Sequence, residues 1–355
     1  MSETLTGTTF HCQADAPEKA IILLNPGSSA AEKASAYARH LEAAYPSVYR
    51  QAKTIYTDPD SRRTIDELRG ALGEPAIITA LGGDETVRIA AVASSSPDIH
   101  PGDSSIVLPV GFGNGCMAAR LAHGDKDYQN PYSVFNNLGT VVTNTLIRMT
   151  VDEAVYDGTF MAGFGAAATG AHTLDSHRKK WGHDIVPVRS AREFLSAAQA
   201  SRDIAAGLMT LAVSRDDMRD EKPPIVSLDI SHASRAAKYL ENPGFSQTKE
   251  RARVFALQSP QQLPDFTRDI QTGRYAGDVL EAPSTLRFRI LDPTYGHIDG
   301  TPFPVPAGSL VTLGFPGLSY QVLTSGNLPR RPTSRYHPRV LATQGFTKFV
   351  CRNTR

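Results

Sequence analysis

Short apolar runs that end at glycine-rich or other turns recur through the first 120 residues, and this repetition constrains the fold more than any other feature. Residues 20–24, 76–81 and 105–110 form such runs, each with the length of a strand buried on both faces. A turn and a stretch that favours a helix follow each run. Because repeated strand–turn–helix units build parallel sheets, we predict an N-terminal parallel-sheet α/β domain with ligands beyond the carboxyl ends of its strands.

The segments between these runs also have recognisable limits. Helices are expected at residues 30–44, 61–72, 86–93 and in a segment that ends at residue 121, with a further strand at residues 47–56. The first helix stops before Pro46, and Gly73 lies just beyond the end of the second. These limits match the usual stop signals of helices.

The pattern changes after residue 150, where short runs separated by glycine and proline turns predict β-strands. The expected strands are residues 140–145, 151–156, 159–162, 284–291, 302–306, 309–315 and 319–323. Residues 191–213 have a helical pattern instead. We therefore predict a second, largely antiparallel β domain with a partly helical insertion.

Three regions follow from these patterns: an α/β domain at 18–148, a β-rich substrate domain at 149–325 and a basic C-terminal tail at 326–355. Residues 323–355 contain seven lysine or arginine residues and no acidic residue. Two interpretations of this tail stay open. It is either a solvated tail or strap, or a segment attracted to anionic lipid head groups.

Composition excludes several classes of protein. A formal net charge of +1 on 355 residues argues against a dedicated nucleic-acid binder, which carries a strong basic excess. No apolar run approaches the roughly 18–20 residues that span a bilayer, and no secretory signal is evident at the N-terminus. Three scattered cysteines are too few for a disulfide framework. We expect a cytoplasmic protein without a transmembrane segment.

Two of the strand–turn–helix junctions carry glycines where a phosphate-binding loop would lie. Glycine lets backbone N–H groups approach phosphate oxygens, and the following helix presents its positive end. Asp84, directly after Gly82 and Gly83, is placed to hold a divalent cation, and magnesium prefers such hard oxygen ligands. Thr86 would either donate its hydroxyl to phosphate or cap the helix. Cys116 is interpreted as a small residue packed beneath the second loop.

Four segments, in the same order along the chain, resemble motifs of the diacylglycerol kinase catalytic family, which includes bacterial lipid kinases and sphingosine kinases. Asn-Pro-Gly-Ser at residues 25–28 resembles Asn-Pro-x-Ser, and Gly-Gly-Asp-Glu-Thr at 82–86 resembles the Gly-Gly-Asp-Gly-Thr signature. Residues 108–121 resemble the Pro-x-Gly-Thr-x-Asn-Asp-x-Ala-Arg segment. His-Ile-Asp-Gly-Thr-Pro at 297–302 resembles the Asp-Gly-Glu-Pro motif. Residues 170–280 carry little similarity.

The resemblance implies a nucleotide-binding α/β domain followed by a β-sandwich domain, with an acceptor lipid between them. It implies ATP and Mg²⁺ as cofactors and phosphorylation of a lipid hydroxyl, such as that of diacylglycerol or a sphingoid base. Asp84 would hold magnesium and Asp299 would lie close to the acceptor hydroxyl, and both are expected to be catalytic. The residues expected to line the nucleotide site are Asn25, Ser28, Thr57, Gly82, Gly83, Asp84, Thr86, Gly111, Gly113 and Asn114. A lipid substrate implies visits to the membrane surface, and a homodimer is left open.

Three departures from the family motifs keep other functions open. Glu85 replaces a glycine, Phe112 replaces a threonine that contacts phosphate, and Thr301 replaces the glutamate that serves as general base. Threonine cannot accept a proton at neutral pH, and loss of a general base costs a factor of about 10²–10⁴. One alternative is therefore a weakly active or inactive nucleotide- or lipid-binding protein on the same fold. Another is a kinase with a soluble acceptor, similar to NAD kinase.

Overall fold

The chain folds into two compact units in the computed structural model. Unit 1 comprises the described residues up to Thr143 and from Tyr320 onward, and unit 2 lies between Asn144 and Ser319. The described residues are 8–9, 17–99, 104–113, 115–131, 139–165, 168, 171–172, 176, 213–214, 225–233, 235–237, 240–241, 251–256, 278–281, 285–290 and 293–325. Residues 191–212 of the expected helical pattern at 191–213, and the basic tail at 326–355, lie outside them, whereas Val213 belongs to a strand.

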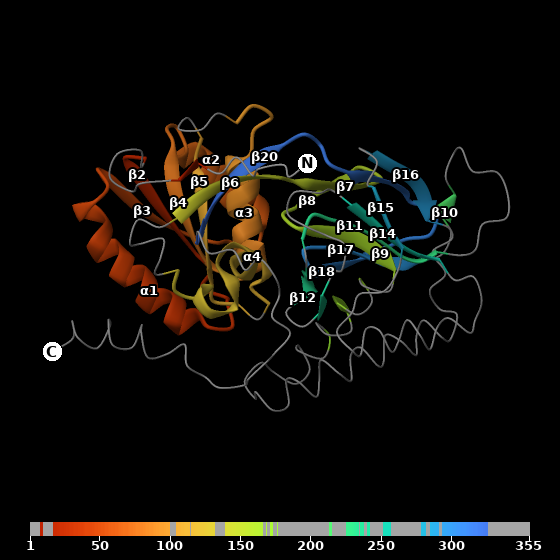
Figure 1. The fold of residues 1–355 in the computed structure, drawn as a ribbon, viewed down its shortest axis with the longest axis horizontal. Coiled ribbons are helices and arrows are strands. Elements are labelled where there is room, and N and C mark those ends of the chain that lie inside the picture. Colours follow the sequence, from red (N-terminus) through yellow and green to blue (C-terminus); the bar gives the residue numbers. More distant parts are fainter. Residues whose placement is uncertain are drawn as a thin grey trace. The chain divides into compact units, whose positions relative to one another are not determined.

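Unit 1 is built on a seven-stranded sheet with the order β1-β6-β20-β5-β4-β2-β3 (Figure 1). Its strands are β1 (Thr8–Thr9), β2 (Lys19–Leu24), β3 (Gln51–Tyr56), β4 (Ala76–Gly82), β5 (Ile106–Gly111), β6 (Gly139–Thr145) and β20 (Ser319–Ser325). Strands β3, β2, β4, β5 and β20 pair in parallel, whereas β1 pairs with β6 in antiparallel orientation. The predicted parallel-sheet α/β domain is confirmed.

The described part of unit 1 has four α-helices: α1 (Ala31–Ala44), α2 (Ser61–Ala71), α3 (Asp84–Ser94) and α4 (Met117–Asp127). α1 ends as Pro46 enters a short 3-10 turn, η1 (Tyr45–Ser47), and Asp60 caps α2 by accepting a hydrogen bond from Arg62 N over 3.1 Å. α3 begins two residues before the predicted start, so Asp84 and Glu85 form its first turn. No helix among the described residues is long and apolar enough to cross a membrane.

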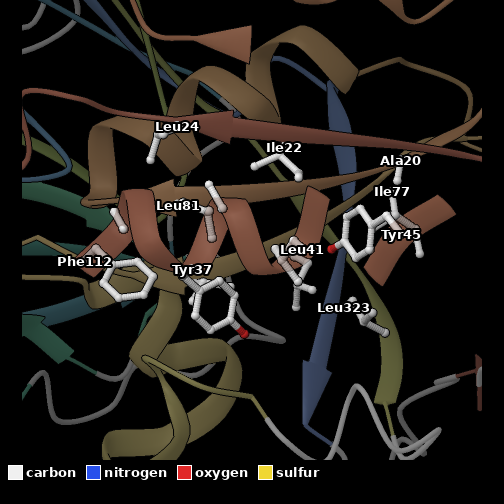
Figure 2. Packing of buried hydrophobic residues seen from close by; sticks show 14 of the residues in the cluster. Ala20, Ile22, Leu24, Tyr37, Leu41, Tyr45, Ile77, Leu81, Phe112 and Leu323 are labelled. Atoms are coloured by element: carbon white, nitrogen blue, oxygen red, sulfur yellow. The ribbon is translucent and has the colours of Figure 1, made fainter. Parts of the chain in front are cut away.

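The core of unit 1 lies between α1 and the sheet (Figure 2). Tyr37 of α1 packs with Ile22 of β2 and Leu81 of β4, both of which are fully buried. The Tyr45 hydroxyl is hydrogen-bonded to Thr79 Oγ1 over 2.6 Å, which compensates the burial of both groups. Five of the six residues of β2 and all seven of β4 are buried, as expected for parallel strands covered on both faces.

Unit 2 contains two larger antiparallel sheets, with the orders β10-β16-β19-β7-β8 and β15-β14-β11-β9-β17-β18, and the separate pair β12-β13. The strands are β7 (Ile147–Val151), β8 (Ala154–Gly158), β9 (Met161–Gly165), β10 (Val213–Ser214), β11 (Ile225–Ser231), β12 (Arg235–Ala237), β13 (Leu240–Glu241), β14 (Arg251–Ala256), β15 (Asp278–Glu281), β16 (Thr285–Ile290), β17 (Thr294–Ile298), β18 (Thr301–Val305) and β19 (Leu310–Gly314). Residues of both larger sheets share one apolar core, in which the rings of Phe164 and Phe288 meet edge to face at 5.5 Å. The predicted antiparallel β-sandwich is confirmed.

The division of the chain differs from the predicted one at β20. We predict residues 319–323 as a strand of the second domain, yet β20 joins the sheet of unit 1 and pairs in parallel with β5. Six of its seven residues are buried, the pattern of a strand covered on both faces rather than of a solvent-facing antiparallel strand. The chain therefore leaves unit 1 through β6 and returns through β20, and unit 1 is discontinuous in sequence.

Candidate functional site

The two glycine-rich turns lie against each other at the carboxyl ends of β4 and β5. Phe112 N donates a hydrogen bond to Gly82 O over 2.7 Å. A Cβ on Gly113 would lie only 2.6 Å from Gly83 Cα, so a side chain at residue 113 would force the two backbones apart. The turns and the first residues of α3 therefore gather at the sheet edge where parallel α/β proteins bind ligands.

Asp84 links the two turns. It belongs to the first turn of α3, and its Oδ1 accepts a hydrogen bond from Ala118 N, in the first turn of α4, over 2.8 Å. Its Oδ2 faces Gly115, where an added Cβ would lie 3.0 Å away. The described residues include no group of three or more His, Cys, Asp or Glu placed to hold a metal ion. Asp84 stays the predicted magnesium ligand, and this ion usually keeps several waters and binds substrate phosphates at its other positions.

The turn after β2 lies beside the first glycine loop. Asn25 N donates to Leu81 O over 3.1 Å, and Asn25 Oδ1 accepts from Gly27 N over 2.8 Å in a side-chain-stabilised turn. An added Cβ on Gly82 would lie 3.2 Å from Asn25 Cβ. Ser28 Oγ is buried and has no hydrogen-bond partner among the described residues. The structure thus brings Asn25 and Gly82 of the predicted site together.

Thr86 lies beneath the loop. Its side chain is fully buried, and a Cβ on Gly82 would collide with its Oγ1. The N-cap of α3 is Gly83 and receives no side-chain hydrogen bond, so the expectation that Thr86 caps this helix is wrong. Its hydroxyl has no partner among the described residues, and leaving a buried hydroxyl unpaired costs about 1–3 kcal/mol. Ser28 Oγ, in the turn after β2, and Thr86 Oγ1, in α3, are therefore two buried hydroxyl oxygens without a hydrogen-bond partner among the described residues.

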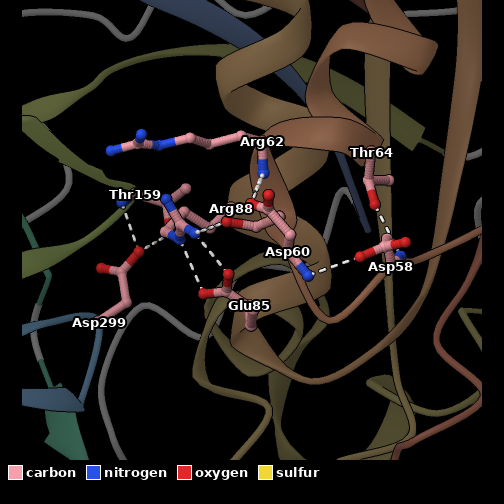
Figure 3. A network of polar contacts seen from close by, with 9 residues as sticks. Asp58, Asp60, Arg62, Thr64, Glu85, Arg88, Thr159 and Asp299 are labelled. Atoms are coloured by element: carbon pink, nitrogen blue, oxygen red, sulfur yellow. Dashed lines mark hydrogen bonds and ion pairs between the residues drawn. The ribbon is translucent and has the colours of Figure 1, made fainter.

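Glu85, the residue that departs from the family's glycine, is paired within its own helix (Figure 3). Arg88 Nε donates to Glu85 Oε2 over 2.8 Å, and Arg88 Nη2 bonds to Glu85 Oε1. Arg88 Nη2 also donates to Ser61 Oγ over 3.2 Å, which ties the pair to α2. The carboxylate is thus offset by a cation one turn away, and the sequence signal for this pairing is the i, i+3 spacing.

Phe112 turns its side chain into the core. It is buried and packs on Tyr37 with the ring centroids 5.5 Å apart (Figure 2). A threonine hydroxyl is missing at this position, but the aromatic ring contributes to the apolar core instead of to the surface of the loop. Phe112 therefore lacks the hydroxyl that the family has at this position, but its ring adds no bulk to the surface of the loop.

The second glycine loop is held by α4. Arg120 Nε donates to Gly115 O over 3.1 Å, and its guanidinium lies 3.8 Å over the ring of Tyr128. Tyr128 O accepts a hydrogen bond from Gly111 N over 2.7 Å. Cys116 adopts a left-handed conformation (φ 52°), and its buried Sγ accepts from Gly113 N over 3.0 Å, as expected for a residue packed beneath the loop.

Thr57, another predicted nucleotide-site residue, lies apart from these contacts. Thr57 follows β3 and donates its backbone N–H to Leu24 O over 2.9 Å, which places it at the carboxyl edge of the same sheet. Asn114 lies outside the described residues.

In unit 2, Asp299 is buried at the turn between β17 and β18 (Figure 3). Asp299 (φ 48°) and Gly300 (φ 81°) form a two-residue hairpin loop in the left-handed conformation. The Asp299 carboxylate accepts hydrogen bonds from Thr159 N (2.6 Å), Thr159 Oγ1 (2.8 Å), Phe160 N (2.9 Å) and Met161 N (3.1 Å). Burial raises the pKa of Asp299, although these hydrogen bonds each lower it.

The surroundings of Asp299 bear on its predicted catalytic role. A carboxylate has about four acceptor positions, and the four donors at residues 159–161 match that number. Thr301, where the family has a glutamate, is exposed at the start of β18 and pairs with Ile298 across the turn. In this geometry Asp299 fixes the β8–β9 connection, and its place beside an acceptor hydroxyl stays a prediction.

Comparisons with known proteins support the fold. No family model and no curated protein sequence matches the chain. A diacylglycerol kinase of Bacillus anthracis str. Sterne has a similar structure, with a TM-score of 0.52 and 9% identity over 88% of this chain and 98% of that one. A putative diacylglycerol kinase of the same organism has a TM-score of 0.54 and 11% identity over 86% and 97% of the two chains. The chain therefore has the two-domain fold of diacylglycerol kinase-like proteins.

Proposed function

We propose that the protein transfers the γ-phosphate of ATP to a lipid hydroxyl, as a kinase of the diacylglycerol kinase type. The observation that carries this proposal is the backbone contact between two glycine loops at the carboxyl ends of adjacent parallel strands, β4 and β5. Such loops bind phosphate through backbone N–H groups and helix N-termini. The shared fold supports the assignment to a lipid kinase rather than to a kinase with a soluble acceptor.

The residues around the loops fit a nucleotide. Ser28 Oγ has no hydrogen-bond partner among the described residues, Gly83 and Gly113 add no side chains of their own to the loops, and Asp84 offers a carboxylate for a cation. The pairing of Glu85 with Arg88 lowers the negative charge that a triphosphate would meet. When bound, ATP supplies the phosphoryl group and magnesium supplies positive charge that stabilises its oxygens. Within the proposal, Asn25, Thr57, Thr86, Gly111 and Asn114 complete the nucleotide site.

A second candidate function is nucleotide or lipid binding without transfer. It is favoured by one observation, namely that Asp299 is held by four donors while Thr301 offers no carboxylate. A protein that lacks a base but keeps its loops would bind ATP and show little turnover. The variant Thr301→Glu would then raise transfer.

The test combines a binding and a transfer measurement. We expect ATP with magnesium to raise the unfolding temperature and to support phosphate transfer to lipids in mixed micelles, with diacylglycerols and sphingoid bases compared. Stabilisation by ATP without transfer to any lipid would favour the binding protein. The absence of both effects would refute the proposed function.

A further inference from the structure

Tyr56 exposes its ring at the last position of β3, the edge strand beside β2 in the seven-stranded sheet of unit 1 (Figure 1). The residue is 60% exposed. Among the residues whose burial the structure describes, no other phenylalanine, tyrosine or tryptophan is exposed. Single exposed apolar side chains are common on protein surfaces, so exposure alone does not mark a site. What distinguishes Tyr56 is its position in the sheet.

Tyr56 ends β3 at the same level as the turns of the proposed nucleotide site. It pairs with Leu24 of β2, which pairs in turn with Leu81 of β4. Leu24 directly precedes the Asn25 turn, and Leu81 directly precedes Gly82. Because neighbouring strands lie about 4.8 Å apart, the backbone of Tyr56 is about 5 Å from that of Leu24 and about 10 Å from that of Leu81. The ring therefore belongs to the same edge of the sheet as the glycine loops.

The side chain of Tyr56 projects from the face of β3 that is turned toward α1. Side chains alternate between the two faces along a strand. Thr54, two residues before Tyr56, donates a hydrogen bond from its Oγ1 to Glu42 Oε1 of α1, whereas Ile55 is buried on the other face. The Tyr56 side chain has no hydrogen bond and no ring contact with a described residue. Its flat surface is therefore open to a ligand at this edge.

A nucleoside triphosphate has two ends of different chemistry, and the two parts of this edge match them. The phosphates bind backbone N–H groups and a cation, which the glycine loops and Asp84 supply within the proposed function. The base is a flat aromatic ring that stacks on aromatic side chains, and such a contact changes affinity by a factor of about 5–100. An exposed tyrosine two strands from the first glycine loop supplies this second kind of contact.

We propose that Tyr56 stacks on the base of the bound nucleotide, an inference that rests on the proposed function. Strand β2 separates Tyr56 from the first glycine loop, so the base and the phosphates bind at neighbouring points along one edge of the sheet. Stacking contacts the flat face of a base and not its hydrogen-bonding edge. Tyr56 therefore favours a nucleoside triphosphate over inorganic triphosphate, and it does not select adenine over guanine.

Three variants of the full chain test this assignment. Tyr56→Phe keeps the ring and Tyr56→Ser removes it, and neither change opens a cavity in the core, because the side chain is largely exposed. Val48→Ser is the matched control, since Val48 is 61% exposed and precedes the amino end of β3, at the opposite edge of the sheet. Calorimetric titration in the presence of magnesium measures the affinity of each protein for ATP, for GTP and for inorganic triphosphate.

We expect Tyr56→Ser to bind ATP and GTP about fivefold to a hundredfold more weakly than the wild type and to bind inorganic triphosphate equally well. Tyr56→Phe and Val48→Ser should bind all three ligands like the wild type. Three results would overturn the stacking assignment while ATP binding by the wild type leaves the proposed function standing: unchanged ATP affinity in Tyr56→Ser, a loss that extends to inorganic triphosphate, or a loss for only one nucleotide. A wild type that binds neither ATP nor triphosphate would refute the proposed function, and the assignment of Tyr56 with it.

Discussion

Glu85 adds a negative charge beside the first glycine loop, and Arg88 pairs with it one helical turn away. The Arg88 side chain is largely buried and is also held by Ser61, so the cation is fixed in place. If the loop binds phosphate as proposed, the charges of Glu85 and Arg88 will therefore affect its affinity as well as the glycine pattern.

Replacing Arg88 by glutamine is expected to weaken ATP binding by about threefold to tenfold, because Glu85 then lacks its partner. The double variant Glu85→Gln/Arg88→Gln should recover most of the affinity, because it removes both charges. Calorimetric titration with ATP and magnesium at low salt measures the ATP affinity of the wild type, of Arg88→Gln and of the double variant. Equal affinities would show that the pair has no influence on the loop.

The contact between Gly113 and Gly83 gives a second prediction for single residues. Gly113→Ala should destabilise unit 1 by about 1–3 kcal/mol, because its Cβ would lie 2.6 Å from Gly83 Cα. Gly70→Ala in α2 is the matched control, since an added Cβ meets no atom within 4 Å and alanine favours the helix. Urea unfolding should show a lower unfolding free energy for Gly113→Ala and no decrease for Gly70→Ala. The reverse order would contradict the close approach of the loops.

Among the secondary-structure elements, the β17–β18 hairpin fixes the connection between β8 and β9 through Asp299. A second aspartate, Asp152, occupies a similar left-handed turn (φ 52°) between β7 and β8, but it is exposed and accepts one hydrogen bond, from Leu310 N over 2.9 Å. Comparing variants of Asp152 and Asp299 therefore distinguishes two free-energy costs. One is the cost of placing a different residue in the left-handed conformation, and the other is the cost of losing a buried carboxylate.

Asp299→Asn is expected to destabilise unit 2 by about 2–4 kcal/mol, because an amide nitrogen would then face backbone N–H donors. Asp152→Asn should change stability little, since asparagine tolerates the left-handed conformation and the site is exposed. Hydrogen exchange at residues 159–161 should accelerate only in the first variant. Unchanged exchange there would leave Asp299 free for a purely chemical role.

At the scale of the whole molecule, β20 completes the sheet of unit 1, although it follows unit 2 in the sequence. The side chain of His123, in α4, connects β20 to β5 through hydrogen bonds. Its Nε2 donates to Pro109 O over 3.0 Å, and its Nδ1 accepts from Ser325 N over 3.2 Å. Burial, partly opposed by the hydrogen bond to Pro109, lowers the pKa of His123 from 6.5 to about 4.

Acidification is therefore expected to destabilise the protein through His123. The unfolded chain takes up the proton first, so stability is complete above pH 6.5 and falls as the pH falls toward about 4. A pKa shift of this size corresponds to about 3 kcal/mol of unfolding free energy. Urea unfolding across this pH window should show a weaker pH dependence for His123→Gln than for the wild type. Equal slopes would exclude His123 as the cause.

The sequence predicts the strands and helices of unit 1 well, because each buried strand is a continuous apolar run that ends at a turn. It misplaces β20, since a short apolar run does not indicate which sheet it joins. The Glu85–Arg88 pair could be recognised from its i, i+3 spacing. The four hydrogen bonds to Asp299 could not be recognised from the sequence. The same holds for the hydrogen bond between His297 Nε2 and Asp229 Oδ1, because both sets of contacts join segments far apart in the chain.

Phosphate transfer from ATP to a lipid hydroxyl, measured side by side for the wild type, Gly113→Ala and Gly70→Ala, tests the proposed kinase most directly. We predict magnesium-dependent transfer by the wild type and by Gly70→Ala, and a marked loss in Gly113→Ala, because only the last change separates the two glycine loops. ATP-independent signal, no transfer by the wild type, or equal transfer by all three proteins would contradict a nucleotide site at these loops.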